Sequence, residues 1–301
     1  MFCALADPHI TEASGIVASA MYDGILYTHN DSGDIARFFA IDSSCRTRAT
    51  FVLSGVQARD WEDISRGPGD TLWLGDIGDN NATRVKGILV HRVIEPAPAE
   101  GVMRLSATSY RLRYPDGPHD AEALLVHPRT GQVLIVTKGF AGGAVYTDTQ
   151  PLQANQPNIL RLVGRVSVPE VTGGDISPDG SHVVLRNYTA AYEWTVKGND
   201  VAGALKGEPT RIPLPGSPQG EAISYSRDGT SLIVTSEGVG ATVQDVDRVT
   251  APSPRPARSQ LTWPRTTWRQ RDWRASRATA MPRPTRQSSC HPLLACGMWM
   301  S

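Results

Sequence analysis

Acidic side chains recur along the chain at similar intervals, each near the start of a short apolar segment. Successive members lie 50, 60, 53 and 46 residues apart. Carboxylates gathered in one place can bind a hard cation such as Ca²⁺, which prefers oxygen ligands, or can act as general acids and bases. The candidate metal ligands are therefore Glu12, Glu62, Glu122, Asp175 and Glu221.

Further polar residues stand next to these acids or at the end of the following apolar segment. The expected ligand-binding residues are Asn30, Asp31, Asp60, Asp76, Asp79, Asn80, Arg186 and Glu237. In a catalytic site, Glu62 and Glu122 would act as general bases or hold a metal. Lys138 or Arg186 would stabilise anionic charge, and His119 would be an accessory acid.

Each unit has the pattern of a strand, a tight turn and a second strand. The strands are rich in β-branched residues, and the turns include Asp23-Gly24 and Asp228-Gly229. Repeats of this length are typical of β-propeller blades, whereas a β-sandwich would not explain an acid at the same place in every unit. We predict an all-β propeller with five visible blades. A sixth blade would have to lie in residues 85–118 or beyond the last visible unit.

Propeller architecture would bring these side chains together. The first strand of a blade lines the channel and the second runs antiparallel to it, so the start of one lies beside the end of the other. The acids, Asp120 among them, would then surround one mouth of the channel. So many carboxylates cannot all stay ionised and unpaired. Either a cation binds them, Lys138 and Arg186 neutralise them, or each caps backbone N–H groups of the next blade.

Charge is distributed unevenly along the chain. Residues 251–301 contain nine Arg and one Asp, which leaves 21 basic and 29 acidic residues before them. An acidic body argues against nucleic acid as a partner of residues 1–245, which we assign to the propeller. We interpret residues 246–301, rich in Arg, Pro and Trp, as a disordered, out-of-frame tail that leaves the ring without its closing strand. The alternative is a basic arm for RNA or membranes.

The four cysteines and the first residues of the chain indicate the compartment in which the protein would be found. No apolar run reaches the roughly 18 residues that span a bilayer, and the start lacks the pattern of a signal peptide, so the chain as written would stay in the cytoplasm. The cysteines form no CxxC pair, and zinc is not expected. Cys3 and Cys45 either form a disulfide in an exported protein or are two free thiols.

The motifs of several enzyme classes are absent. The sequence contains no Gly-x-Ser-x-Gly, no His-Glu-x-x-His and no glycine-rich phosphate loop. Residues 75–80 read Gly-Asp-Ile-Gly-Asp-Asn, but no helix pattern follows them, so we interpret them as a tight polar turn.

Five segments carry a family resemblance. They are Thr28–Gly33, Asp60–Ile64, Gly75–Asn80, Tyr114–Glu122 and Pro218–Glu221. These segments resemble those of a group of mostly uncharacterised bacterial exported propeller proteins, and more distantly the esterase-like phytase and lactonase-type propellers. The resemblance covers residues 3–240 and carries over no settled activity. It implies export, with a signal peptide upstream of Cys3, and a Cys3–Cys45 bridge.

Two functions fit these observations. We favour a non-catalytic propeller, because no nucleophile motif is present. Its acidic mouth would bind a small molecule, a glycan or a partner protein, with Ca²⁺ as the cofactor that it would suit. The alternative is a metal-assisted hydrolase of esters, lactones or phosphate esters that uses the same carboxylates. In either case we expect a monomer, located outside the cytoplasm if the resemblance holds.

Overall fold

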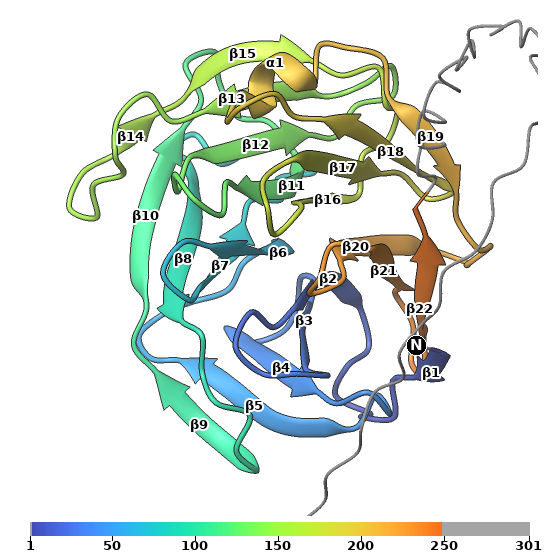
Figure 1. Cartoon of the computed structure of the whole chain (residues 1–301). Coiled ribbons are helices and arrows are strands. Elements are labelled where there is room, and N and C mark those ends of the chain that lie inside the picture. The colour runs from blue at the N-terminus through green and yellow to red at the C-terminus, as the bar shows by residue number, and fades with distance from the viewer. Residues whose placement is uncertain (1, 249–301) are drawn as a thin grey trace, which may run out of the picture. The chain divides into compact units, whose positions relative to one another are not determined.

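Residues 2–248 are described by the computed structural model, and they form a five-bladed β-propeller (Figure 1). The strands make five separate sheets, and the one helix in this part of the chain is the four-residue α1 (Val201–Ala204). A search of this part found no helix with the length and apolar character to cross a membrane. The predicted all-β propeller is confirmed. The tail predicted for residues 246–301 lies outside the described residues, except for its first three.

Each blade is a sheet whose strands follow one another outward from the axis. The first strands are β2 (Ala13–Ala18), β6 (Trp61–Gly67), β11 (Ala121–Val126), β16 (Gly173–Ile176) and β20 (Gly220–Tyr225). The second strands are β3 (Leu26–Asn30), β7 (Thr71–Asp76), β12 (Val133–Thr137), β17 (His182–Arg186) and β21 (Ser231–Ser236). The third strands are β4 (Arg37–Ile41), β8 (Ile88–Ile94), β13 (Ala144–Thr147), β18 (Ala190–Thr195) and β22 (Thr242–Asp247). The fourth strands are β5 (Thr47–Leu53), β10 (Thr108–Arg113), β15 (Arg161–Arg165), β19 (Thr210–Pro213) and β1 (Phe2–Ala4).

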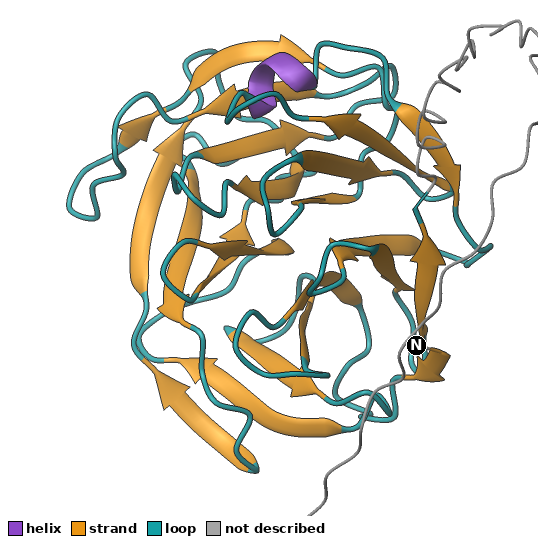
Figure 2. Cartoon of the chain, viewed as in Figure 1, coloured by secondary structure: helices purple, strands orange, loops and turns teal. Residues whose placement is uncertain are grey.

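The five first strands form the inner wall of the ring. Each contacts the first strand of the next blade, in the closed order β2, β6, β11, β16 and β20 (labelled in Figure 1, with the same view in Figure 2). Nearly all their residues are buried, because a neighbouring blade covers each face of the sheet. Strands covered on both faces read as continuous apolar runs, which is why these segments stand out in the sequence.

The core is divided into five apolar clusters, one between each pair of adjacent blades. Between blades 1 and 2, for example, the rings of Phe38 and Phe51 stack 4.9 Å apart beside Trp61. Each blade therefore depends on both neighbours, and the inner strands are held at fixed positions around the axis.

The N-terminal strand closes the ring. β1 pairs antiparallel with β22, with Cys3 opposite Val243, and so supplies the fourth strand of blade 5. β22 itself is the third strand, and it extends past residue 245, where we had placed the end of the propeller. The expectation that the ring lacks its closing strand was therefore wrong, because that strand comes from the other end of the chain.

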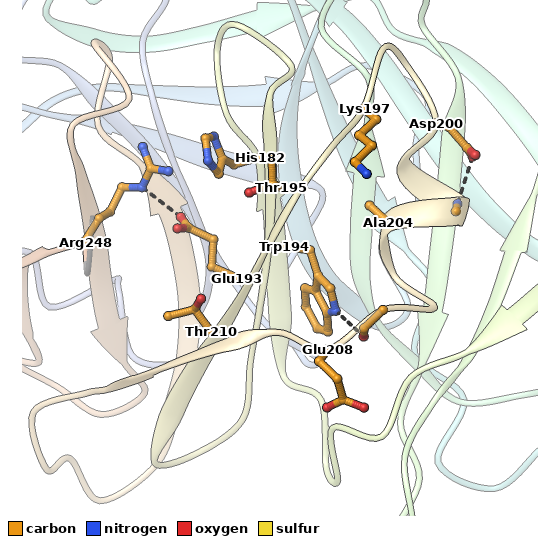
Figure 3. Close-up of a pocket in the computed structure, with 12 residues that line it drawn as sticks. His182, Glu193, Trp194, Thr195, Lys197, Asp200, Ala204, Glu208, Thr210 and Arg248 are labelled. Carbon is orange, nitrogen blue, oxygen red and sulfur yellow. Dashed lines mark hydrogen bonds and ion pairs between the residues drawn. The ribbon is translucent and has the colours of Figure 1, made fainter. Parts of the chain in front are cut away.

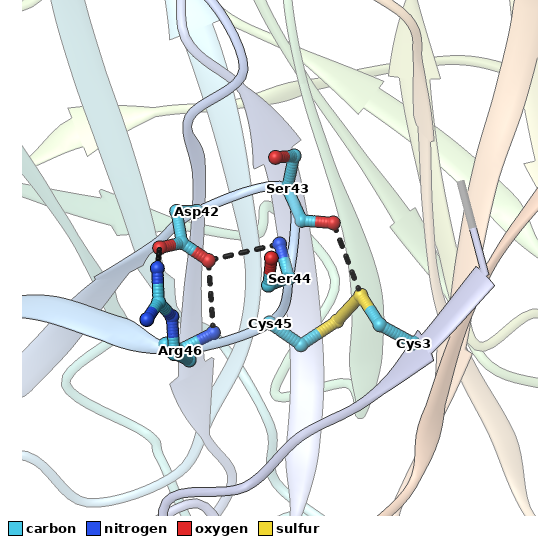
Figure 4. The surroundings of a disulfide bond; sticks show 6 residues. All are labelled: Cys3, Asp42, Ser43, Ser44, Cys45 and Arg46. Atoms are coloured by element: carbon cyan, nitrogen blue, oxygen red, sulfur yellow. Dashed lines mark hydrogen bonds and ion pairs between the residues drawn. A yellow bond between two sulfur atoms is a disulfide. The ribbon is translucent and has the colours of Figure 1, made fainter.

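A disulfide joins Cys3 in β1 to Cys45 in the turn between β4 and β5 (Figure 4). Of the two alternatives that the sequence left open, the bonded one is present. The Asp42 carboxylate shapes this turn by accepting hydrogen bonds from the backbone N–H groups of Ser44 at 2.8 Å and Arg46 at 3.2 Å. The bond therefore ties the closing strand of blade 5 to blade 1.

Two blades carry a fifth, outer strand that the sequence did not indicate. β9 (Gly101–Leu105) runs parallel to β5 of blade 1, and β14 (Asn158–Ile159) runs parallel to β10 of blade 2. Each comes from the chain of the following blade, so it links two neighbours. Residues 85–118 thus contain β8, β9 and β10 and do not form a sixth blade.

Candidate functional site

The start of each first strand lies beside the end of the second strand of its blade. The register pairs Ala13 with Asn30, Trp61 with Asp76, Ala121 with Thr137, Gly173 with Arg186 and Gly220 with Ser236. Because the blades surround one axis, these ten positions lie at the same end of it. We call this end the mouth.

A β-bulge re-aims side chains at the mouth. The ladder is irregular after the first paired residue in blades 1, 2, 3 and 5 but regular in blade 4. A bulge leaves a residue unpaired and changes the direction of its side chain. The residue that follows the first pair is Glu62, Glu122 and Glu221 in blades 2, 3 and 5, but Ser14 and Gly174 in blades 1 and 4. The mouth therefore receives a glutamate from three blades.

A second tier of charged residues lies where the first strands begin and the second strands end. In three blades the residue directly after the second strand donates its backbone N–H to the carbonyl oxygen of the residue directly before the first strand. These pairs are Asp31 to Glu12 at 2.9 Å, Lys138 to Asp120 at 3.0 Å and Glu237 to Gln219 at 3.0 Å. Asp31, Lys138 and Glu237 thus occupy equivalent places after the second strands, and Glu12 and Asp120 occupy equivalent places before the first strands.

Two groups of three carboxylates come within reach of a single ion. One oxygen from each of Asp31, Asp60 and Glu62 lies within 4.8 Å of the other two, and the same holds for Glu62, Asp120 and Glu122. Two oxygen ligands of one Ca²⁺, each about 2.4 Å from it, can be at most about 4.8 Å apart. Both groups have the spacing of a metal site, and Glu62 belongs to both. We call these five residues the acidic cluster.

Lys138 is the cation paired with the acidic cluster. Its Nζ donates to Glu122 Oε1 at 2.9 Å and lies 5.5 Å from the centre of the Tyr188 ring. Burial alone would lower the pKa of Lys138, but the charge of Glu122 and this hydrogen bond raise it well above its usual value. One lysine cannot neutralise five carboxylates, so the cluster keeps an excess of negative charge.

Burial, reinforced by mutual repulsion, raises the pKa of most acids at the mouth. The pKa of Glu62 lies well above its ordinary value through burial and then the charges of Glu122 and Asp31. Burial raises the pKa of Glu122 to about 7 although Lys138 opposes it, and that of Asp31 to about 6. The same causes raise the pKa of Glu221 to about 8 and of Glu237 to about 7. A bound cation would stabilise all of these groups as anions.

Some of these oxygens have no hydrogen-bond partner among the described residues. They are the buried atoms Asp31 Oδ1 and Glu221 Oε2. Glu221 is only 4% exposed, so water does not readily satisfy it. A buried acceptor without a partner costs roughly 1–3 kcal/mol, and more when it is charged. Charged carboxylate oxygens, some of which lack hydrogen-bond partners in the described part of the chain, suit Ca²⁺ as ligands and do not match the preference of zinc for nitrogen and sulfur ligands.

Gly78 packs directly against this cluster. Its N–H donates to the carbonyl oxygen of Asp60 at 3.2 Å. A Cβ at this position would lie 1.9 Å from Glu62 Oε1 and 2.6 Å from Asp60 Oδ2. The loop after β7 therefore passes so close to both carboxylates that any side chain at residue 78 would displace them.

Asp175 is not among the carboxylates that the fold brings together, although we expected it to be a metal ligand. Its carboxylate accepts hydrogen bonds from the Tyr225 N–H at 2.9 Å and the Ser224 hydroxyl at 3.1 Å, which joins blade 4 to blade 5. It is the third residue of its strand, as Asp63 is in blade 2. Asp63 likewise accepts from the Leu124 N–H of blade 3 at 2.9 Å. Asp175 is thus equivalent to this inter-blade link and not to Glu62.

Three residues that we expected to bind ligand form hydrogen bonds to neighbouring segments of the chain. The Asn30 side chain hydrogen-bonds the backbone at residues 9, 11 and 12. Asp76 accepts from Arg84 Nη1 at 2.6 Å. Asp79 accepts from the backbone N–H groups of Thr83 at 2.8 Å and Arg84 at 2.7 Å. These side chains shape the mouth without pointing free groups into it.

Arg186, Asn80 and His119 stand apart from the acidic cluster. Arg186 is buried and donates to two carbonyl oxygens of blade 5, at 2.8 and 3.1 Å. Asn80 is exposed on its loop. His119 Nε2 lies 3.0 Å from an Asp116 oxygen and 2.9 Å from the Tyr146 hydroxyl. Within the described chain it has no hydrogen bond to the cluster, so its expected role as an accessory acid gains no support.

Two residues of the site escaped the sequence analysis. Tyr188 carries no local signal, since its contact with Lys138 comes from a neighbouring blade. Gly78 lies in the polar turn of residues 75–80, where its repeated glycines could have indicated a close approach of the backbone.

A cavity of about 770 Å³ lies elsewhere, beside β18 and α1 (Figure 3). Its lining includes His182, which begins β17, whereas the mouth lies at the other end of that strand. Some of its polar groups are paired with one another or with the backbone. Glu193 accepts from Arg248 Nε at 2.7 Å, and Trp194 Nε1 donates to the Gly207 carbonyl oxygen at 2.9 Å. We assign it no function.

Comparisons with known proteins assign the chain to no family. No family model and no curated protein matches the chain. A luciferin-regenerating enzyme is 11% identical over 83% of this chain and 95% of its own, with a TM-score of 0.48. A Xanthomonas campestris gluconolactonase is 10% identical over 74% and 68%, with a TM-score of 0.42. Hydrazine synthase of Kuenenia stuttgartiensis is 13% identical over 75% of this chain, with a TM-score of 0.40, and the chain spans only 56% of its length. At such identities the likeness concerns the propeller fold alone.

Proposed function

We propose that the protein is a Ca²⁺-binding β-propeller whose mouth holds an oxygen-bearing ligand through the bound ion. The observation that carries this proposal is the position of Glu62. Its buried carboxylate is shared by two groups of three acids and accepts no hydrogen bond from the described residues. A divalent cation is the partner that would satisfy such a group.

The arrangement leaves room in the coordination shell of an ion. Ca²⁺ takes six to eight oxygen ligands, and each group offers one oxygen from each of three carboxylates at the required spacing. Bidentate binding, water and a ligand oxygen would supply the rest. Asp31 and Asp60 would hold the ion on one side of Glu62, or Asp120 and Glu122 on the other.

A hydrolase of carbonyl compounds or phosphate esters is the second candidate. It is favoured by Lys138, whose ammonium group lies beside the cluster and could stabilise a developing oxyanion. Glu221, with its pKa raised to about 8 by burial and the charge of Glu122, would hold a proton at neutral pH and could act as a general acid.

Thermal unfolding of the full chain tests the metal site. An ion at 100 times its dissociation constant stabilises the folded state by about 2.7 kcal/mol. We expect Ca²⁺ to raise the melting temperature by several degrees and Glu122→Gln to abolish that rise. Glu100→Gln is the control, because the Glu100 side chain is 86% exposed and directly precedes the outer strand β9. If Ca²⁺ does not change the melting temperature of the unaltered protein, the proposal is contradicted.

Turnover separates the two candidates. In the presence of Ca²⁺, the protein is assayed on aryl esters, lactones and phosphate esters. A hydrolase would show turnover that Lys138→Met lowers roughly 100- to 1,000-fold in kcat, the range for loss of one oxyanion-stabilising group. Binding of Ca²⁺ without turnover of any of these substrates would support the binding function over the hydrolase.

A further inference from the structure

Large apolar side chains stand exposed on the loops around the mouth. Each blade has one loop at this end between its second and third strands, at residues 31–36, 77–87, 138–143, 187–189 and 237–241. Of the nine large apolar side chains exposed in residues 2–248, four lie on these loops. The fifth loop carries the half-buried Tyr188. We call these residues the apolar rim: Ile35, Val85, Phe140, Tyr188 and Val239.

Three members of the rim are each the second residue of a four-residue turn. In blades 2, 3 and 5 a backbone hydrogen bond closes a four-residue turn. The N–H of residue 87 donates to the carbonyl oxygen of residue 84 at 2.8 Å, that of residue 142 to residue 139 at 3.1 Å, and that of residue 241 to residue 238 at 3.1 Å. The second residue of each turn is Val85, Phe140 or Val239, exposed by 69, 90 and 73%. Proline and polar residues are usual at turns. A recurrence in three blades differs from the scattered apolar residues of any surface.

The turn that presents Phe140 has a defined backbone. The Gly139 carbonyl oxygen accepts a second hydrogen bond, from the Glu170 N–H at 2.9 Å. Gly142 has a φ of 121°, and a Cβ there would lie 2.1 Å from the Val166 carbonyl oxygen. Because the loop is held in this way, a ligand that contacts Phe140 need not order it first, which lowers the cost of binding.

The rim is continuous with the acidic cluster through blade 4. Tyr188 contacts Lys138, which pairs with Glu122 of the cluster. Phe140 lies two residues after Lys138, and Val239 lies two residues after Glu237. The loop of blade 4 is the shortest of the five, and the longer loops with Phe140 and Val239 stand on either side of it. An alkyl chain that leaves the mouth here would cross Tyr188 between two apolar residues.

We propose that the ligand of the mouth is a neutral amphiphile with a carbonyl head group, such as an ester or a lactone, and an alkyl chain. The carbonyl oxygen would bind the ion near Lys138, and the chain would lie on Tyr188 between Phe140 and Val239. This inference rests on the proposed Ca²⁺-binding function and narrows it. The five carboxylates outnumber the charges of Lys138 and one divalent ion, so the mouth favours a neutral head group over a phosphate.

A homologous series of non-hydrolysable ligands tests this proposal. N-alkyl-2-pyrrolidinones, from methyl to octyl, are titrated calorimetrically into the full chain saturated with Ca²⁺. A buried methylene contributes about a fourfold gain in affinity, so we expect the dissociation constant to fall by roughly that factor per carbon. The double variant Phe140→Ser with Val239→Ser should reduce this gain to less than about twofold per carbon, since the surface that buries the chain is gone.

Matched controls separate the rim from the metal site. Val102→Ser removes a side chain that is 72% exposed on the outer strand β9, and it should keep the full chain-length dependence. Ca²⁺ titration without pyrrolidinone should give the same affinity in all three proteins. A chain-length dependence that survives in the double variant, or that is missing from a protein that binds Ca²⁺, would overturn the amphiphile assignment. Failure to bind Ca²⁺ would contradict the proposed function instead.

Discussion

Glu62 and Asp60 are positioned by a backbone that passes within contact distance of both. Because a Cβ at Gly78 would overlap Glu62 Oε1, Gly78→Ala must push at least one carboxylate out of place. We expect its Ca²⁺ affinity to fall about 10- to 100-fold, the range for loss of a group that orients a metal ligand. Calcium titration calorimetry measures this change.

The matched control is Gly216→Ala, because a Cβ at Gly216 would meet no atom within 4 Å. Its Ca²⁺ affinity should equal that of the unaltered protein. Equal affinities in the Gly78 and Gly216 variants would mean that neither Glu62 nor Asp60 holds the ion.

At the scale of the strand, adjacent acids have different roles. Glu62 sits at the bulge of β6 and points to the mouth, whereas Asp63 and Asp175 link neighbouring blades through backbone N–H groups. We therefore expect Asp175→Asn to lower the free energy of unfolding by about 1–3 kcal/mol, the cost of disturbing a buried hydrogen-bonded group. Its Ca²⁺ affinity should stay unchanged. Urea unfolding and calcium titration of the same sample give both quantities, and a loss of Ca²⁺ binding would place Asp175 in the metal site.

The closing strand is the second element with a testable role. The disulfide between Cys3 and Cys45 closes a segment of 42 residues. Constraint of the unfolded chain by a loop of that length is worth about 4 kcal/mol in the chain-entropy account. We expect the variant with serine at both positions to lose stability of this order in urea unfolding. A reducing agent should destabilise the unaltered protein and leave that variant unchanged, and the opposite pattern would contradict a role for the bond.

The sequence predicts the strands that carry local patterns and misses the contacts that close the ring. The first and second strands are apolar runs with Asp-Gly turns, so their order and the meeting of Asp31, Glu62 and Glu122 follow from antiparallel pairing. The pairing of β1 with β22 joins opposite ends of the chain, and no local pattern reports it. The bulge in β6 shifts the alternation of inward and outward side chains by one residue, so Glu62 and Asp175 take different roles. Alignment of the repeats by sequence does not show where such a bulge occurs.

For the whole molecule, the acids at the mouth determine how stability depends on pH. Without Ca²⁺, burial raises the pKa of Glu221 to about 8 and of Glu237 to about 7, above the ordinary value of 4.5. The folded chain thus binds more protons than the unfolded chain in this range, so stability falls as pH rises towards 8. Burial lowers the pKa of His29 and His91 from 6.5 to about 4, which makes stability rise with pH only below 6.5.

Between pH 6.5 and 8 Glu221, Glu237 and Glu122 of the mouth therefore titrate, while His29 and His91 stay neutral in the folded chain. We expect the melting temperature without Ca²⁺ to fall across this window. Saturating Ca²⁺ should remove the fall, because the ion binds the deprotonated carboxylates and its affinity grows with pH. Melting curves at several pH values, with Ca²⁺ and with a chelator, measure both effects. Parallel curves with and without the ion would show that the carboxylates at the mouth do not hold it.

A divalent cation held by Glu62 at the mouth of the propeller is what both proposals require. Calcium titration calorimetry of the full chain, Glu62→Gln and Glu100→Gln measures whether that ion binds. We expect saturable binding by the unaltered protein and by Glu100→Gln, and no measurable binding by Glu62→Gln at the same concentrations. Absence of binding in the unaltered protein, or equal binding in all three, would show that Glu62 does not hold a cation.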